Sequence, residues 1–254
     1  MFIDVHAHLT DSKYCGDIVP VIERAKNNGV GLIISSGYDI ESSEKSQAIA
    51  SLFDGVYFSA GVHPDEAKTL NNEVIDRLLV LLKDKKCVAV GEIGFDFYWN
   101  KSTEEEQIYA FEKQMEIADH LKLPFVVHSR DASAKTVAFL KERKSLIKKG
   151  FLMHCYSESA ETAKIYQDLG GYFSFGGVIT FKNAKKDEII KQISKERLLT
   201  ETDCPYLSPH PYRGQINEPS KVVFVANKIA EILEKDQTET TDILRENARR
   251  LFGI

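Results

Sequence analysis

The sequence has 254 residues, of which 43% are hydrophobic and 28% are charged, so a packed core is expected and disorder is not. This length suits one α/β barrel, which typically needs about 250 residues, and we expect a single domain spanning residues 1–254. The net charge of -5 argues against a broad basic surface that coats nucleic acid, although it leaves room for an enzyme that holds a few nucleotides in a pocket.

Short β-rich segments alternate with longer helical patterns, and the first such segment, residues 2–5, is followed by His-Ala-His. The other strands are expected at residues 31–35, 56–60, 87–90, 125–127, 150–153, 171–174 and 198–200. Strands that alternate with helices indicate a parallel sheet, either a closed barrel or an open doubly wound sheet. An open nucleotide-binding sheet usually has a glycine-rich turn after its first strand, where this chain has histidines. We therefore favour an α/β fold of the (β/α)8 TIM-barrel type.

Helix signals fill the segments between these strands. Residues 17–28 have apolar side chains on one helical face. Ser102 and Glu105 form a capping-box pattern at the start of another helix. Pro219 suits the first turn of a later helix, and a last helix is expected near residues 239–252.

Membrane and disulfide signals are missing from the sequence. No apolar run approaches the ~20 residues that cross a bilayer, and no secretory signal is visible, so we expect a cytoplasmic protein. Cys15, Cys87, Cys155 and Cys204 form no Cys-x-x-Cys pair and are most simply free thiols. We expect Cys155 and Cys204 to be small buried packing residues.

Polar residues gather at the expected C-terminal ends of strands, where barrel enzymes build their active sites. Side chains two apart on a strand point to the same side, so His6 and His8 can reach one divalent ion. Glu92, between two glycines, can bridge two cations with its two oxygens. The candidates at strand ends are His6, His8, His63, Glu92, Asp96, His128, Arg130, His154, Glu201 and Asp203.

Each candidate also has a structural explanation when it is taken alone. Histidines at strand ends are often bonded only to backbone, Glu92 could pair with a lysine, and Asp203 could cap a helix. The set as a whole favours metal, because four histidines and two carboxylates at one barrel mouth would be costly to desolvate unless something bound them. Nitrogen and oxygen donors without thiolate suit Zn, Mn, Mg, Ni or Co.

Seven motifs follow one another along nearly the whole chain: residues 2–8 (FIDVHAH), 61–64 (GVHP), 91–96 (GEIGFD), 127–132 (VHSRDA), 154–157 (HCYS), 201–207 (ETDCPYL) and 217–219 (NEP). With these motifs the chain resembles the TatD family of metal-dependent nucleases, within the amidohydrolase superfamily. The resemblance implies two divalent cations per subunit, Mg, Mn or Zn, and hydrolysis of DNA phosphodiester bonds from the 3′ end of a single strand. Some relatives are linked to RNA or to removing D-amino acids from tRNA.

The resemblance also implies ligand sets. It places one ion on His6, His8, Glu92 and Asp203, and a second on Glu92, His128 and His154, with Glu92 shared. The chain departs from the family where a second histidine is often found, at Asp65, and where basic residues are often found, at Gln215 and Ile216. Both changes remove positive charge where a phosphate would sit, which weakens the case for DNA but not for metal.

The catalytic residues expected for a two-metal hydrolysis are Asp203, Glu92 and Glu201. Asp203 is the candidate proton acceptor, because it would touch both metal and water. Glu201 would orient a ligand from behind, unless it forms a surface salt bridge. The expected substrate-binding residues are His63, Arg130, Arg213 and Asn217. Arg130 would pair with a phosphate oxygen, whereas plain loop roles stay open for the other three.

Two rival functions stay open at this point. A barrel hydrolase that acts on a carbonyl, such as a D-aminoacyl-tRNA deacylase, would use the same water activation. A non-catalytic metal-binding protein on the same scaffold is the second rival, although the full ligand set argues against it. We expect a nucleic-acid 3′ end as the partner, no membrane, and a monomer or weak oligomer.

Overall fold

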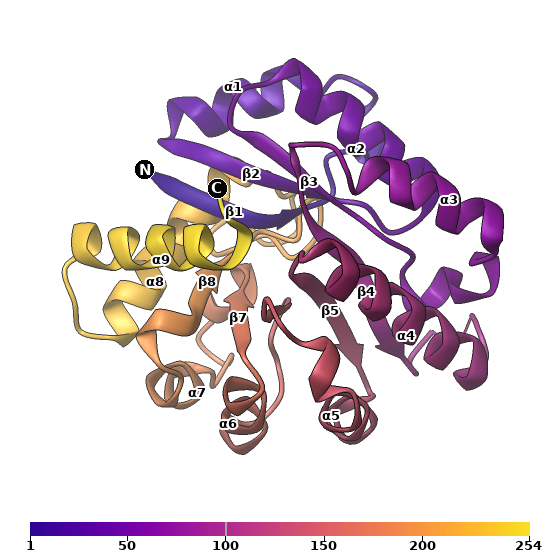
Figure 1. The fold of residues 1–254 in the computed structure, drawn as a ribbon. Helices are drawn as coiled ribbons and strands as arrows, with labels where there is room; N and C mark the ends of the chain where they lie inside the picture. Colours follow the sequence, from indigo (N-terminus) through magenta and orange to yellow (C-terminus); the bar gives the residue numbers. More distant parts are fainter. Residues whose placement is uncertain (100) are drawn as a thin grey trace.

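The computed structural model describes residues 1–99 and 101–254, and in this part of the chain parallel strands form one sheet surrounded by helices (Figure 1). The strands are β1 (Phe2–Ala7), β2 (Val30–Ser36), β3 (Val56–Ala60), β4 (Cys87–Asp96), β5 (Phe125–Arg130), β6 (Phe151–Met153), β7 (Gly171–Phe175) and β8 (Leu198–Thr200). They pair in sequence order from β1 to β8, each with its successor. The predicted (β/α)8 barrel is confirmed.

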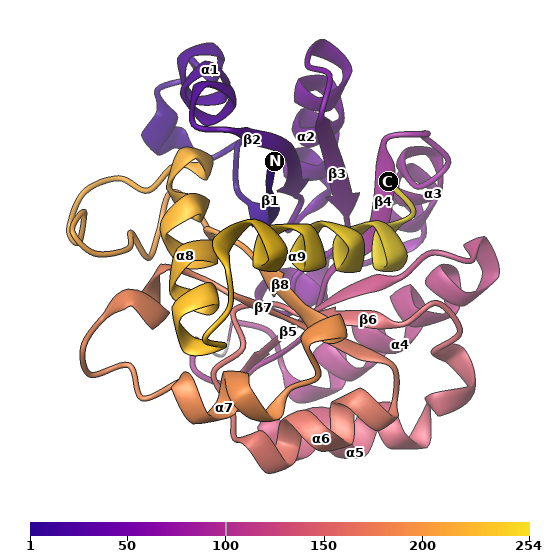
Figure 2. The same ribbon diagram turned by 90° about the vertical axis from the view of Figure 1, so that its left-hand side faces the viewer.

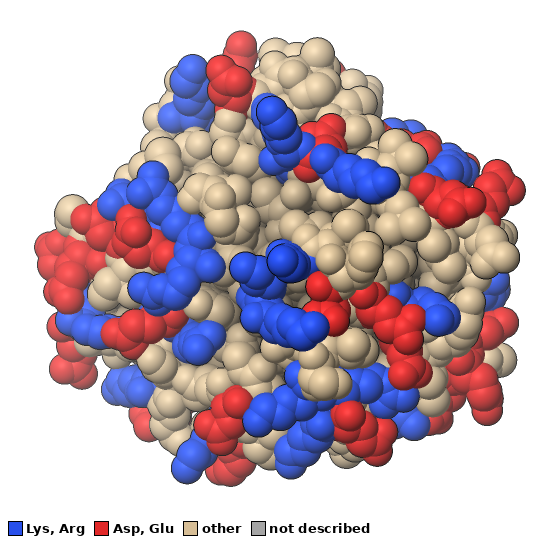
Figure 3. Space-filling model, in the orientation of Figure 1, with Lys and Arg blue, Asp and Glu red and all other residues tan. Residues whose placement is uncertain are grey.

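The helices follow the strands around the outside of the barrel. They are α1 (Val19–Asn27), α2 (Ile40–Leu52), α3 (Asn72–Leu81), α4 (Glu104–Leu121), α5 (Ser133–Glu142), α6 (Ala160–Asp168), α7 (Asp187–Gln192), α8 (Val222–Ile232) and α9 (Gln237–Phe252). No helix in the described ranges has the length and apolar character needed to span a membrane. On the face drawn in Figure 3, Lys and Arg side chains are interspersed with Asp and Glu.

The barrel is closed between β1 and the segment that follows β8. The buried carboxylate of Asp4 accepts a hydrogen bond from the Thr202 backbone N–H at 2.9 Å and another from the Thr202 hydroxyl. The Asp203 N–H donates to the His6 carbonyl at 3.0 Å, and the His8 N–H donates to the Cys204 carbonyl at 2.8 Å. Closing the barrel therefore places Asp203 directly beside His6 in β1 and His8, which follows this strand.

The N-terminal end of the barrel is filled with apolar side chains. Helix α9 lies across this end (Figure 2), where Leu251 and Phe252 pack with Ile3, Val5 and Leu199 in one buried cluster. In β/α barrels such a plugged end serves stability, and the opposite end is left to carry polar function. The mouth of this barrel is accordingly at the C-terminal ends of its strands.

Strand β4 is longer than its sequence predicts. The prediction ended the strand at Val90, but it continues to Asp96, so Glu92 lies inside the strand rather than after it. Two glycines allow this, because β4 and β5 approach closely: a Cβ atom on Gly94 would lie 2.0 Å from the His128 carbonyl oxygen. Gly94 also has a φ of +142°, which side-chain-bearing residues rarely adopt.

The capping box of α4 is shifted by one residue from its predicted place. Thr103 is the N-cap and pairs with Glu106, not Ser102 with Glu105. Ser102 is buried, and its hydroxyl donates to the Asp65 carbonyl at 3.0 Å. Both pairs match the Ser/Thr-x-x-Glu pattern. Because the Ser102 side chain is buried and bonded to Asp65, the helix is capped by Thr103.

The cysteines behave largely as predicted. None of the four forms a disulfide in the described structure, so they are free thiols. Cys204 is buried as expected, whereas Cys155 is only partly buried.

Candidate metal centre

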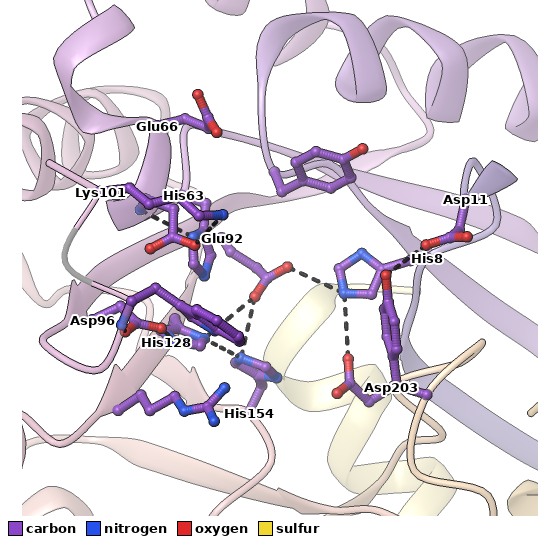
Figure 4. Close-up of a pocket in the computed structure, with 15 residues that line it drawn as sticks. His8, Asp11, His63, Glu66, Glu92, Asp96, Lys101, His128, His154 and Asp203 are labelled. Atoms are coloured by element: carbon purple, nitrogen blue, oxygen red, sulfur yellow. Dashed lines mark hydrogen bonds and ion pairs between the residues drawn. The ribbon is translucent and has the colours of Figure 1, made fainter. Parts of the chain in front are cut away.

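Glu92 stands at the centre of a polar cluster at the barrel mouth (Figure 4). Its Oε1 lies 3.3 Å from His6 Nε2 and 3.5 Å from His8 Nε2. Its Oε2 lies 3.1 Å from His154 Nε2 and 3.8 Å from His128 Nδ1. The two carboxylate oxygens therefore face two different pairs of imidazoles.

Asp203 completes the first of these two groups. Its Oδ1 lies 3.2 Å from His8 Nε2 and 3.8 Å from His6 Nε2. In the second group His128 Nδ1 lies 3.1 Å from His154 Nε2. The structure thus brings all six predicted ligands together, in two groups that share Glu92.

The cluster lacks protein partners for several of its inward atoms. His6 Nε2 and Glu92 Oε1 are buried without a hydrogen-bond partner among the described residues. A buried polar group without a partner is destabilising unless an ion or another group satisfies it. Imidazole nitrogens and carboxylate oxygens are donors that Zn accepts, and the carboxylates also suit Mn and Mg, so these residues fit divalent cations.

The pKa values of the histidines reflect the crowding of charge. Burial lowers the pKa of His6 to about 4, helped by the nearby His154. Burial also opposes protonation of His8, but the hydrogen bond to Asp203 and the charge of Glu92 raise its pKa to about 9. Without a bound cation, the carboxylates of the cluster therefore keep imidazoles such as that of His8 protonated. A bound metal ion would displace these protons.

The outer nitrogens of His6 and His8 are held by Ser36, the last residue of β2. The Ser36 hydroxyl lies 3.1 Å from His6 Nδ1, and His8 Nδ1 donates to the Ser36 carbonyl at 3.3 Å. With Nδ1 bonded outward, both rings present Nε2 to the centre of the site. Partners of this kind set the tautomer and orientation of metal-binding imidazoles.

Asp96 has the same function for His128. Its Oδ2 accepts a hydrogen bond from His128 Nε2 at 2.9 Å, which leaves the Nδ1 lone pair directed at Glu92 and His154. The His128 hydrogen bond and two backbone N–H donors outweigh the effect of burial and lower the pKa of Asp96 to about 2. Asp96 is therefore ionised at neutral pH and suited to hold His128 in this tautomer.

Glu201 lies behind His154, not on the surface. It is fully buried, accepts a hydrogen bond from the Ser174 hydroxyl, and places Oε2 3.9 Å from His154 Nδ1. Burial raises the pKa of Glu201 to about 7, against the opposing charge of His154. The sequence singled out Glu201, but it gave no sign of the contributions of Ser36 and Ser174, which are ordinary small polar residues of strands.

Of the four expected substrate-binding residues, two line the pocket and two lie away from it. His63 and Arg130 line the pocket. Asn217 is buried away from it, and its amide donates to the carbonyls of Thr202 at 2.8 Å and Tyr206 at 2.7 Å. Arg213 is exposed and lies over the Phe181 ring, 5.0 Å from its centroid, outside the pocket lining.

Positive charge does reach the pocket, from residues that the sequence analysis did not place there together. Lys101 Nζ lies 3.1 Å from Asp65 Oδ2, and both side chains line the pocket with Arg130. The acidic residue at position 65, where the family often has histidine, is thus paired with a cation from another loop. Six acidic and two basic side chains line the pocket in the described structure.

Replacing Asp96 with asparagine is expected to weaken metal binding about 10- to 100-fold, which is typical for the loss of a partner behind a ligating histidine. An asparagine amide at the place of Oδ2 would donate to His128 Nε2 and so favour the tautomer protonated at Nδ1. Calorimetric titration with Mn²⁺ or Zn²⁺ measures the effect. Asp119→Asn, which alters a carboxylate paired with Lys148 at 2.8 Å, is the control. Equal affinities for the Asp96 variant and the control would contradict this assignment.

Comparison with known proteins gives consistent matches over the whole chain. The model of a family described as TatD related DNase matches residues 3–253. The metal-dependent hydrolase YabD of Bacillus subtilis is 42% identical over 255 residues, covering 100% of both chains. The 3′-5′ ssDNA/RNA exonuclease TatD of Cronobacter sakazakii is 32% identical over 255 residues, covering 98% of this chain and 97% of its own. The crystal structure of YjjV, a TatD homologue from Escherichia coli, has a TM-score of 0.93 and 30% identity, and the match covers 100% of this chain and 98% of that one.

Proposed function

Because the chain belongs to the TatD-related DNase family and is a metal-dependent hydrolase, we propose that its pocket cleaves phosphodiester bonds at the 3′ end of a single nucleic-acid strand with two divalent metal ions. One observation carries the proposal: the two oxygens of Glu92 face two separate imidazole pairs, His6 with His8 and His128 with His154. A carboxylate in this arrangement is suited to bridge two ions, the device used by many phosphodiester-cleaving enzymes.

The residues of the chain have separable tasks in this reaction. His6, His8, Asp203 and Glu92 Oε1 would hold one Mg, Mn or Zn ion, and His128, His154 and Glu92 Oε2 would hold the other. When bound, the ions supply an activated water and neutralise charge on the leaving oxygen. The Asp203 side chain is 15% exposed, so it reaches the water of the pocket and can accept a proton there. Glu201, whose Oε2 lies 3.9 Å from His154 Nδ1, would orient this imidazole from behind through its charge.

The charge of the pocket explains why a phosphodiester would need the ions. Even with a proton on the His8 imidazole, the six acidic side chains outnumber the cationic ones, so the metal-free protein repels an anionic substrate. Two divalent ions would bring the formal charge of this lining to zero, with Lys101 and Arg130 left to contact phosphate oxygens. These two cations favour a phosphodiester over a neutral ester or amide.

A panel of substrates tests the proposal directly. The purified protein is stripped with a chelator, restored with Mg²⁺, Mn²⁺ or Zn²⁺, and given single-stranded DNA and RNA labelled at either end, D-aminoacyl-tRNA and simple esters. We expect mononucleotides to be released from the 3′ end of the single strands by the restored enzyme, and not by the stripped one. Deacylation of D-aminoacyl-tRNA without nucleotide release would favour the carbonyl hydrolase, and no turnover with metal bound would favour the non-catalytic alternative. The cytoplasmic location and the monomeric or weakly oligomeric state stay predictions.

A further inference from the structure

One wall of the pocket carries an exposed aromatic side chain, Trp99, which is the single tryptophan of the sequence. Its exposed fraction is 55%, although tryptophans are highly buried on average. Trp99 lines the same pocket as His128 and His154. A large aromatic surface left in water beside a candidate active site is suited to cover an apolar part of the substrate.

The position of Trp99 is tied to the metal centre through Asp96. One carboxylate oxygen of Asp96 accepts the hydrogen bond from His128, and the other accepts those from the backbone N–H groups of Tyr98 and Trp99, each at 2.9 Å. The same buried side chain thus fixes a ligand of the second ion and the backbone of the tryptophan. A group stacked on Trp99 would consequently have a defined place relative to the reacting bond.

Two cations flank the aromatic surface. The Arg130 guanidinium carbon lies 4.0 Å from the Tyr98 ring centroid and 5.5 Å from that of Trp99. Lys101 Nζ lies 5.8 Å from the Trp99 centroid and 3.1 Å from Asp65. An exposed aromatic face beside basic side chains is the combination that binds single-stranded nucleic acid, with bases stacked on the ring and phosphates on the cations.

We propose that Trp99 stacks on the base of the terminal nucleotide, while Lys101 and Arg130 contact its phosphate groups. This inference rests on the proposed function and adds to it a specificity element: the enzyme recognises an unpaired nucleobase of any kind at the strand end. Stacking of this type tolerates every base, because each has a π face. A base still held in a duplex would not be available to the ring.

The test compares two oligothymidylates that differ only at their ends. One is intact. The other lacks the base on its 5′-terminal nucleotide and on its 3′-terminal nucleotide but keeps every phosphate. For the metal-loaded wild-type enzyme we expect the initial kcat/KM for removal of the first residue to be at least about 10-fold higher with the intact end, the size expected for one base–aromatic stack. Trp99→Ala should lose this preference by slowing on the intact substrate alone, and Trp99→Phe should restore part of it.

Two further variants separate stacking from other effects. Lys101→Ala should raise KM for both oligonucleotides by a similar factor, because the phosphates are unchanged between them. Tyr109→Ala is the matched control, since Tyr109 is 46% exposed on α4 outside the pocket and should leave both rates unchanged. Equal rates of the wild-type enzyme on the two ends, or an equal loss on both in Trp99→Ala, would overturn the proposal.

The single tryptophan gives an independent readout. In stopped-flow mixing with the metal-loaded enzyme, the intact oligonucleotide should quench Trp99 fluorescence before product appears, and the base-free one should not. If the wild-type enzyme cleaves neither substrate, the proposed function fails, and this binding signal decides the stacking proposal by itself: quenching by the intact end alone supports it, and equal or absent quenching overturns it.

Discussion

Glu92→Gln is expected to lower kcat on single-stranded DNA by about 1,000-fold or more and to reduce the metal content from two ions toward one. Glutamine keeps the size of the side chain but has one oxygen in place of two. The amide NH2 group would therefore face one of the two cation positions, either the one beside His6 and His8 or the one beside His128 and His154. An N–H group is a donor and cannot ligate a cation. Two-metal catalysis needs both ions for several kcal/mol of charge stabilisation, and each 1.36 kcal/mol is a factor of ten in rate.

Metal analysis of the gel-filtered protein and the initial rate of nucleotide release measure this prediction together. Glu112→Gln, which removes a carboxylate paired with Arg143 at 3.0 Å on the outside of the barrel, is the matched control and should keep both ions and full activity. A Glu92→Gln variant that retains two ions and wild-type rates would show that Glu92 does not bridge. Loss of activity in both variants would point instead to a general loss of folding, which circular dichroism would detect.

The ligands could be predicted from the sequence because each carries a local signal. His6 and His8 are two positions apart at the end of a strand, with only Ala7 between them, and His128 and His154 each follow an apolar segment. In a parallel barrel all such positions meet at one end, so topology alone converts scattered local signals into one site. For the same reason Glu201 and Asp203 were expected at the same end of the barrel as His6 and His8, nearly 200 positions earlier in the chain.

The contacts of the supporting residues could not be predicted in this way, although Asp96 and Glu201 are themselves among the candidates at strand ends. The bond between Asp96 and His128 joins two strands and depends on their register, which the sequence does not specify. Arg213 and Asn217 lie in the loop between β8 and α8, whose path is set by backbone hydrogen bonds rather than by periodicity. Asn217, which the sequence offered as a substrate contact, donates its amide hydrogens to two carbonyls of that loop.

Asp203→Asn is expected to reduce kcat by a factor between about 100 and 10,000, the range found when a general base is removed, with little change in KM. Asparagine keeps an oxygen that can face His8 and His6, so at least part of the metal binding should persist, but the side chain can no longer accept a proton. The effects of the two substitutions should therefore differ: Glu92→Gln loses an ion, whereas Asp203→Asn slows the reaction with metal still present.

The pH dependence gives this last prediction a second measurement. Burial favours the protonated form of Asp203, but the hydrogen bond from His8 and the charges of His8, His6 and His154 outweigh it and lower the pKa of Asp203 below its ordinary value. The carboxylate is consequently ionised at neutral pH, and its capacity to accept a proton is lost only as the pH falls through that lowered pKa. The wild-type kcat should decline in the acid range for this reason, and the part of the decline due to Asp203 should be absent in Asp203→Asn. Unchanged hydrolysis by a metal-loaded Asp203→Asn enzyme would exclude Asp203 as the proton acceptor and leave it as a ligand alone.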